Sequence, residues 1–240
     1  MSQRRSGFNP TGDGVRVAAG RAGTLPAMQC FDAVVVGGGA AGLFCAGRAG
    51  QRGLKVLLID HSAQVAEKIR ISGGGRCNFT NRDAGAANYL SANPHFCRSA
   101  LSRYTPSDFI ALLEKHGIRY HEKHKGQLFC DGSANDIIAM LLRECDAGAV
   151  TRWSACHIDS VVFSGSSAGT DSVSSYRINS NQGPVSSRAL VVASGGLSIP
   201  ATGASDFGYR IASQFGLRLV APRPGLVLSL IHISEPTRPY

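Results

Sequence analysis

The chain has 240 residues, of which 43% are hydrophobic and 17% are charged, a composition that excludes a disordered chain. Its formal net charge of +9 is compatible with an anionic cofactor and, more loosely, with nucleic acid, but no Lys/Arg block of the kind that marks a nucleic-acid-binding arm is present, and we expect no DNA partner. Because no apolar stretch reaches the roughly 18 residues of a transmembrane helix and no signal-peptide pattern is present, we expect a cytoplasmic protein without a membrane partner.

The N-terminal segment is rich in Gly, Arg and Ala and has no hydrophobic periodicity. We therefore expect residues 1–30 to be disordered and to lie outside the folded domain. Met28 stands just before the first apolar run, so residues 1–27 are predicted to be a dispensable or wrongly assigned extension.

A dinucleotide-binding βαβ unit is predicted over residues 31–60. The apolar run Ala33–Val36 suits a buried parallel strand and is followed at once by a G-x-G-x-x-G sequence. The first glycine allows a tight turn, the second lets backbone N–H groups approach a pyrophosphate, and the third lets the next helix pack closely. The N-terminus of that helix also favours an anion. The predicted pyrophosphate site is Gly37, Gly39, Ala40, Ala41 and Gly42.

The second strand of this unit, residues 55–59, ends at an acidic residue. Asp60 is placed to accept hydrogen bonds from the hydroxyl groups of an adenosine ribose, and His61 follows it at the same edge. The motif alone does not separate FAD from NAD(P). The alternative is a flexible glycine loop with Asp60 as a solvated strand end.

A second glycine-rich stretch, ISGGGRCNFTN, follows a short connecting turn and helix. Three glycines in a row can wrap closely around an anionic or planar ligand, and the polar residues among them offer N–H, guanidinium and amide donors. The alternative is a surface linker, which has no need for this mixture. The predicted ligand loop is Ser72, Gly73, Gly74, Gly75, Arg76, Cys77 and Asn78.

The central part of the chain alternates between helical and strand patterns. Thr105 is predicted to cap a helix that ends at Gly117. A hairpin then turns around residues 123–126, and residues 164–174 form a Ser/Gly loop of low complexity. The other predicted elements are a helix over 96–104, a helix starting at Ser133 or Asn135, one or two strands within 150–163, and strands over 176–179 and 188–193.

The histidines and cysteines of this region do not form a metal-binding pattern. The spacing of His116, His121, His124 and Cys130 matches no zinc motif, so no metal site is expected. The chain has seven cysteines and no C-x-x-C motif, and in the cytoplasm we expect most of them to be reduced and buried.

The last predicted strand runs directly into small residues. After residues 189–193 come Ser194, Gly195 and Gly196, so the end of the strand can lie against a cofactor without side-chain obstruction. A helix through Ile211 follows, for which Asp206 is a candidate N-terminal cap.

In these segments the chain resembles the YhiN/BaiN-like family of bacterial NAD(P)/FAD-dependent oxidoreductases, the aminoacetone oxidase-like flavoproteins. The resemblance covers roughly residues 31–225, and its most specific motif is ISGGGRCNFTN. The other matching pieces are DAVVVGGGAAGL, GQLFCDGSANDII and VVASGGLSIPATGASDFGYRIASQFG. The family usually has proline in place of Cys130 and threonine in place of Ser194.

The resemblance implies a Rossmann-like FAD-binding α/β domain of the glutathione-reductase type, with a parallel sheet, helices on its faces and a small antiparallel β element. FAD would be held by both glycine loops, Asp60 and the turn at Ser194–Gly196. The reaction would be hydride transfer to an activated C=C bond of an enone or of uracil in rRNA, with NAD(P)H as transient electron donor. The alternatives are a non-catalytic nucleotide- or RNA-binding module and an inactive fragment.

The resemblance also bears on the thiols. Glutathione-reductase-like enzymes carry a second cysteine five positions after the first, but here Arg82 follows Cys77 at that distance, which disfavours disulfide reduction. Cys77 is the candidate catalytic residue, as a proton donor whose pKa Arg76 would lower; the alternative is a packed structural thiol.

Family members are about twice as long, and the resemblance ends near residue 227. We expect residues 31–227 to form the FAD-binding domain with the start of a second domain, and residues 228–240 to be a non-native tail that resembles a translated sequencing adapter. The sequence leaves open the substrate, the choice of NADH or NADPH, the oligomeric state, the native C-terminal half and whether the chain as given folds and binds FAD.

Overall fold

The computed structural model describes residues 28–165 and 175–222. The predictions for residues 1–27, for most of the Ser/Gly loop and for the tail over 228–240 fall outside these ranges. Within them, no helix is long and apolar enough to cross a membrane.

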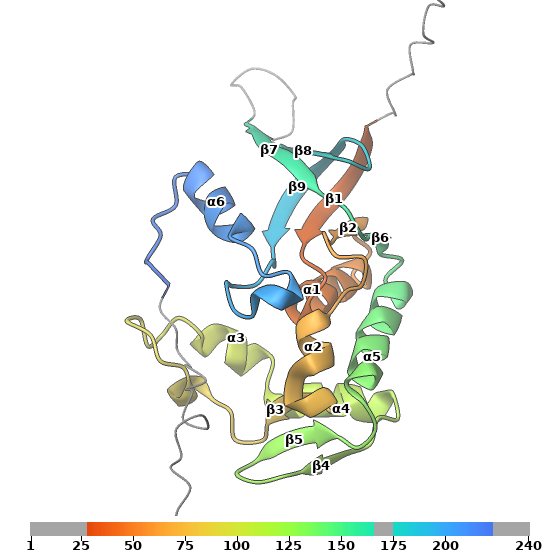
Figure 1. Cartoon of the computed structure of the whole chain (residues 1–240), viewed down its shortest axis with the longest axis vertical. Coiled ribbons are helices and arrows are strands. Elements are labelled where there is room, and N and C mark those ends of the chain that lie inside the picture. Colours follow the sequence, from red (N-terminus) through yellow and green to blue (C-terminus); the bar gives the residue numbers. More distant parts are fainter. Residues whose placement is uncertain (1–27, 166–174, 223–240) are drawn as a thin grey trace, which may run out of the picture.

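A six-stranded sheet forms the centre of the fold (Figure 1), with the order β6-β2-β1-β9-β8-β7. The first four strands in this order are parallel, and β8 and β7 extend the sheet as an antiparallel hairpin. The strands are β1 (Gln29–Val36), β2 (Val56–Ile59), β6 (Thr151–Trp153), β7 (Ile158–Ser164), β8 (Ser175–Ser180) and β9 (Val185–Val192).

Helices cover both faces of this sheet. Helices α1 and α5 pack against each other on one face, whereas α6 packs over the hairpin and β9 on the other (Figure 1). The α-helices are α1 (Ala40–Gly50), α2 (Glu67–Ile71), α3 (Arg98–Arg103), α4 (Pro106–Lys115), α5 (Ala134–Ala147) and α6 (Phe207–Gln214). Short 3₁₀ turns span η1 (Ser72–Gly75), η2 (Ala86–Asn88) and η3 (Pro200–Thr202).

A small antiparallel sheet with the order β3-β5-β4 lies below α2 in the view of Figure 1 and contacts α4 through β3. Its strands are β3 (Asn78–Asn81), β4 (Tyr120–Glu122) and β5 (Gln127–Cys130). The predicted hairpin is therefore confirmed. The prediction that Asn78 belongs to the ligand loop is wrong, because Asn78 begins β3 and pairs with Phe129 of β5.

The hydrophobic core has two parts, one on each face of the large sheet. Alternate strand residues point to opposite faces, so Val35 and Leu58 pack with α1 and α5, whereas Val34 and Leu57 pack on the α6 side. These four side chains are between 0% and 1% exposed. The sheet is thus buried on both faces, as expected for parallel strands in an α/β fold.

Two element boundaries and one helix cap differ from the sequence-based expectations. β1 begins at Gln29, inside the segment expected to be disordered, because Gln29 and Cys30 pair with the first residues of β9. The helix expected from residue 96 begins at Arg98. Asp206 precedes α6, but its side chain does not cap the helix and instead accepts a hydrogen bond of 2.9 Å from Nε of Arg210.

Candidate functional site

The first glycine run joins three strand ends to helix α1. Gly37 has φ +111°, and a Cβ there would clash with the backbone of Ala193 at the end of β9. A Cβ at Gly42 would clash with the carbonyl oxygen of Gly37. The N–H of Gly37 donates to the carbonyl of Ile59 at 2.8 Å, and the N–H of Ala193 donates to that of Val36 at 2.7 Å. The glycines therefore let the three strand ends and α1 meet at backbone contact.

Gly39 differs from its neighbours because it faces open space. A Cβ at Gly39 would meet no heavy atom within 4 Å. Gly39 is also the N-cap residue of α1, which has no side-chain cap and no acidic residue in its first turn. The first N–H groups of a helix lack intrahelical acceptors and carry the positive end of the helix dipole. The space beside Gly39 is thus suited to a phosphate group.

Asp60 lies at the end of β2, beside this helix terminus. Its Oδ2 accepts a hydrogen bond from the N–H of Gly38, and its Oδ1 accepts one of 2.7 Å from the N–H of Ser62. The side chain is 11% exposed. Each carboxylate oxygen has a second lone pair, so the fixed carboxylate can still accept a hydrogen bond from a ligand hydroxyl.

A cavity of about 1050 Å³ extends from Asp60 past the start of α1 to the small sheet. Its volume matches the upper end of the range for ligand pockets, about 300–1,000 Å³. The structure brings together in its lining these residues from the sequence-predicted site: Gly37, Gly39, Ala40, Ala41, Asp60, His61, Ser72, Cys77, Asn78, Ser194 and Gly195.

The other predicted residues have different positions. Gly42 packs α1 against the turn at Gly37, and Gly196 lines an adjacent shallow recess with Gly208 and Tyr209. Gly73, Gly74, Gly75 and Arg76 form a turn that does not contribute to the lining of the cavity.

Cys77 is held at the cavity wall in an uncommon backbone conformation. Its φ is +52°, and the residue is 5% exposed. Burial raises the pKa of the Cys77 thiol, and a hydrogen bond with Ser72 opposes this only in part. The expectation that Arg76 lowers this pKa is therefore wrong. The thiol stays protonated at neutral pH, which suits a proton donor and not a thiolate nucleophile.

The loop after β9 is attached to helix α2. Nζ of Lys68 donates to the carbonyl of Gly196 at 3.2 Å and to Oγ of Ser198 at 3.1 Å. Lys68 also lines the cavity. The sequence did not identify this lysine, because only the folded structure shows that α2 approaches the end of β9.

An aromatic wall at the α3–α4 side of the cavity was also not predicted. Phe44 and Tyr104 have ring centroids 4.9 Å apart, and Phe79 and Phe109 have centroids 6.1 Å apart. All four line the cavity. One available signal was the spacing of Phe44, four residues after Ala40 and hence on the same face of α1. The other three come from separate elements that no local pattern connects.

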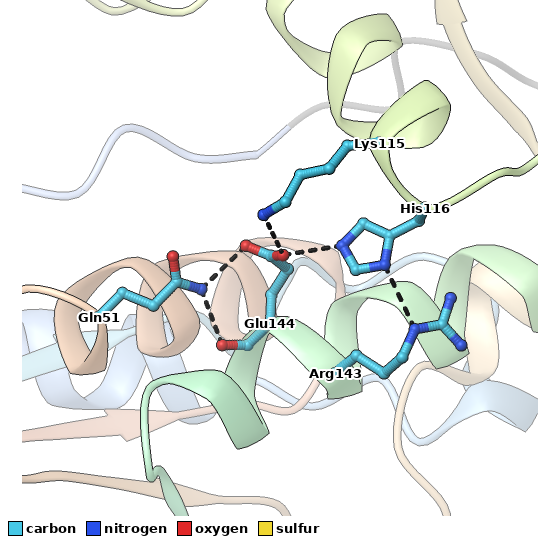
Figure 2. A network of polar contacts seen from close by, with 5 residues as sticks. All are labelled: Gln51, Lys115, His116, Arg143 and Glu144. Atoms are coloured by element: carbon cyan, nitrogen blue, oxygen red, sulfur yellow. Dashed lines mark hydrogen bonds and ion pairs between the residues drawn. The ribbon is translucent and has the colours of Figure 1, made fainter.

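A polar network lies at the far end of α1 (Figure 2). The Glu144 carboxylate accepts three side-chain hydrogen bonds. The donors are Nε2 of His116 at 2.8 Å, Nζ of Lys115 at 3.3 Å and Nε2 of Gln51 at 2.8 Å. Nε of Arg143 donates to Nδ1 of His116 at 3.3 Å, which leaves the proton of the neutral ring on Nε2. The network thus joins α4 and α5 to the C-terminal end of α1.

The Glu144 carboxylate is 8% exposed, and burial alone would raise its pKa. The hydrogen bonds from Gln51, His116 and Lys115 outweigh burial and bring the pKa to about 2. Since none of these side chains lines the cavity, the network positions helices and does not contact a ligand there. In the described ranges, no group of three or more His, Cys, Asp or Glu residues is placed to hold a metal ion.

The parallel sheet, the glycine junction and the cavity at the strand ends define a Rossmann-like dinucleotide-binding domain. The chain belongs to the family described as HI0933-like protein Rossmann domain, which matches residues 31–233. This confirms the predicted fold class, a Rossmann-like α/β domain with a mostly parallel sheet and a small antiparallel element.

Two similar curated proteins carry the name ribosomal RNA dihydrouridine synthase. The one from Escherichia coli is 50% identical over 205 residues, which cover 85% of this chain and 49% of that protein. The one from Haemophilus influenzae is 43% identical, covering 83% and 49%. A 3-dehydro-bile acid delta(4,6)-reductase from Clostridium scindens is 22% identical, covering 80% and 46%. The chain thus spans about half the length of these relatives.

Among solved structures, the THI4 protein of Thermovibrio ammonificans aligns with a TM-score of 0.49 at 16% identity, covering 79% of this chain and 64% of that one. Glycine oxidase from Geobacillus kaustophilus aligns with a TM-score of 0.41 at 14% identity, covering 80% and 60%.

Proposed function

We propose that this chain is the FAD-binding part of a cytoplasmic flavin-dependent oxidoreductase. The observation that carries the proposal is the open space at Gly39, where the uncapped start of α1 meets a cavity that also contains Asp60. A ligand with a pyrophosphate and a ribose fits this pair of features. The family and the names of the relatives support the same assignment.

The described residues fit FAD as follows. The N–H groups at the start of α1 would bind the pyrophosphate, and Asp60 would accept hydrogen bonds from the ribose hydroxyls. The remaining cavity is large and leads to Cys77 and Asn78, and Ser194 and Gly195 also line it. The isoalloxazine ring would occupy this part, where no long side chain of the glycine-rich loops obstructs it.

The proposed reaction is reduction of a C=C bond in a uracil ring of ribosomal RNA. Dihydrouridine differs from uridine by two hydrogens, so the reaction needs one hydride and one proton. When bound, FAD supplies the hydride after reduction by NAD(P)H. The name of the relatives at 50% and 43% identity favours rRNA over the enone of the bile-acid reductase, which is 22% identical.

The proton would come from Cys77. A donor must be protonated at working pH and lie in the cavity, and burial keeps this thiol protonated. Cys77→Ala should therefore slow substrate reduction by about 100-fold or more, the lower end for general acid catalysis. Reduction of the flavin by NAD(P)H should be unchanged, since that step needs no proton from Cys77. Equal loss of both steps would contradict this role.

The purified chain should be yellow, or become yellow with added FAD, and NAD(P)H should bleach it under anaerobic conditions. Incubation with unmodified bacterial rRNA should then produce dihydrouridine, detected by mass spectrometry as two added hydrogens. A colourless protein that cannot be reconstituted with FAD would refute the proposed function.

A further inference from the structure

Strand β4 and the residues on either side of it carry basic side chains on one face, and backbone hydrogen bonds of Arg119 with Asp131 and of Lys123 with Gln127 continue the strand pairing there. The pleat of the strand turns alternate residues to opposite faces of the small sheet. Tyr120 faces inward, where its ring packs edge-on against Phe79 with centroids 5.6 Å apart. Arg119, His121 and Lys123 therefore share the outer face, which we call the basic face. Arg119 and Lys123 are exposed, and the His121 side chain is 42% exposed.

The basic face rests on an aromatic ring. The His121 ring stacks on Phe129 of β5 with centroids 6.2 Å apart, and Nζ of Lys123 lies 5.5 Å from the same ring's centroid. The neighbouring acids are already engaged. Asp131 pairs with His121 at 2.8 Å, and Glu122 pairs with Arg82 at 3.4 Å. Among the described residues, neither Arg119 nor Lys123 has an ion-pair partner, so their charges can meet an external anion.

The turn next to the basic face is held in one shape. Lys125 and Gly126 both have positive φ, +51° and +74°. Nδ2 of Asn81 donates to the carbonyl of Lys125 at 2.8 Å, and the N–H of Arg82 donates to that of Gly126 at 2.8 Å. The Lys125 side chain is exposed on this turn. A fixed backbone reduces the entropy lost when such side chains bind a ligand.

The basic face and the cavity are parts of the same small sheet. Phe129 pairs with His121 on one side and with Asn78 on the other, and Asn78 lines the cavity. Since neighbouring strands lie about 4.8 Å apart, the backbones of His121 and Asn78 are separated by roughly 10 Å. A polymer whose reacting unit occupies the cavity could also reach this face.

We propose that the basic face binds the phosphate backbone of single-stranded RNA whose target base enters the cavity. The inference rests on the proposed function and adds the surface that would hold the polymer. Arg119 and Lys123 would contact phosphates, and the His121 ring would offer a stacking surface for a neighbouring base. Enzymes that modify a base act on single-stranded or extruded nucleotides, which fits contacts beside the cavity instead of within a duplex groove.

The test compares two double variants of the FAD-loaded full chain. R119Q/K123Q removes two charges from the basic face, and R177Q/R188Q removes two exposed charges from β8 and β9 of the large sheet. Binding of a labelled single-stranded RNA of mixed sequence is measured by fluorescence anisotropy between 0.05 and 0.3 M salt. Circular dichroism melts of both variants check that the fold is kept.

R119Q/K123Q should lower the slope of log affinity against log salt by about 1.4, since each lost phosphate contact on a single strand contributes about 0.7. At 0.1 M salt this corresponds to about 25-fold weaker binding. R177Q/R188Q should bind within twofold of wild type. Equal loss in both variants, or no loss in R119Q/K123Q, would overturn the proposal.

Two further measurements distinguish RNA binding by the basic face from general anion attraction and from loss of the flavin site. Poly-glutamate should bind much more weakly than RNA; binding of both polymers with the same loss in R119Q/K123Q would show general anion attraction and would overturn the RNA assignment. Flavin reduction by NAD(P)H is measured on the same samples. If flavin reduction is normal and R119Q/K123Q does not weaken RNA binding, only the role of the basic face is refuted. If the wild-type chain does not bind FAD, the proposed function itself is refuted.

Discussion

The two glycine runs of this protein look alike in sequence but have different physical roles. In the first run, a Cβ at Gly37 or Gly42 would clash with backbone atoms of other elements. In the second, Gly74 and Gly75 have positive φ but open space around them, and only Gly73 is packed, because a Cβ there would lie 2.8 Å from the backbone N of Asn78. Packing therefore constrains the first run at Gly37 and Gly42, whereas the shape of a turn requires glycine at Gly74 and Gly75. Only the first run contributes its glycines to the cavity lining.

This difference shows that a run of glycines does not by itself mark a ligand loop. At the first run, the glycines bring an uncapped helix terminus to the strand ends, and the ligand site follows from that meeting. At the second, the turn places the following residues, Cys77 and Asn78, at the cavity wall. The glycines there act indirectly, through the position of those two residues.

The largest effect is expected for Gly42→Ala. The added methyl would meet the carbonyl oxygen of Gly37, a backbone atom that cannot move without separating α1 from the sheet. We expect a loss of about 3 kcal/mol in the free energy of unfolding, the upper part of the usual range for overpacking. Urea unfolding followed by circular dichroism measures it. Stability equal to wild type would mean that α1 is not packed as described.

A smaller effect is expected at the other end of α1. Glu144→Gln should lower the free energy of unfolding at pH 7 by about 2 kcal/mol. This is less than the full pKa shift of Glu144 implies, because the Lys115 side chain is 68% exposed and water screens its charge. The Glu144 pKa is lowered from 4.5 to about 2 on folding. Its stabilisation is therefore complete above pH 4.5 and lost as the pH falls through 2.

Urea unfolding of wild type and Glu144→Gln between pH 7 and pH 2 checks this sign. The stability difference between the two proteins should shrink as the pH falls from 4.5 to about 2, because the wild-type carboxylate becomes protonated. A difference that stays constant down to pH 2 would show that the carboxylate charge contributes nothing to holding α1, α4 and α5 together.

The smallest effect is expected for Gly74→Ala. A Cβ at Gly74 meets no heavy atom within 4 Å, so the cost is only that of a left-handed backbone conformation. This is about 1 kcal/mol for a residue other than glycine. The same urea measurement applies. A loss as large as that of Gly42→Ala would remove the distinction between the two runs.

Much of the fold could be predicted from local patterns. The strand before Gly37, the hairpin and the Thr105 cap were visible in the sequence, and Thr105 does accept a hydrogen bond of 3.3 Å from the N–H of Asp108. These features depend on neighbouring residues, for which spacing and residue type are enough. Strand β3 was missed because it exists only through its pairing with β5, some fifty residues later.

The candidate site was predictable where a motif carries its own geometry. The start of α1 and Asp60 belong to one βαβ unit, so their meeting follows from the spacing. The aromatic wall and the contacts of Lys68 depend on the packing of distant elements. The pKa of Cys77 was predicted in the wrong direction because the sequence shows a neighbouring arginine but not the burial of the thiol.

The most direct test of the central claim is FAD binding to Gly39→Asp and to Gly74→Asp. Asp at the N-cap should keep or raise the stability of α1, but its carboxylate would occupy the space proposed for the pyrophosphate. We predict that Gly39→Asp melts without FAD at or above the wild-type temperature and binds FAD about 100-fold more weakly, whereas Gly74→Asp loses less than tenfold. Wild-type FAD affinity in Gly39→Asp would contradict the assignment of this helix terminus as the dinucleotide site.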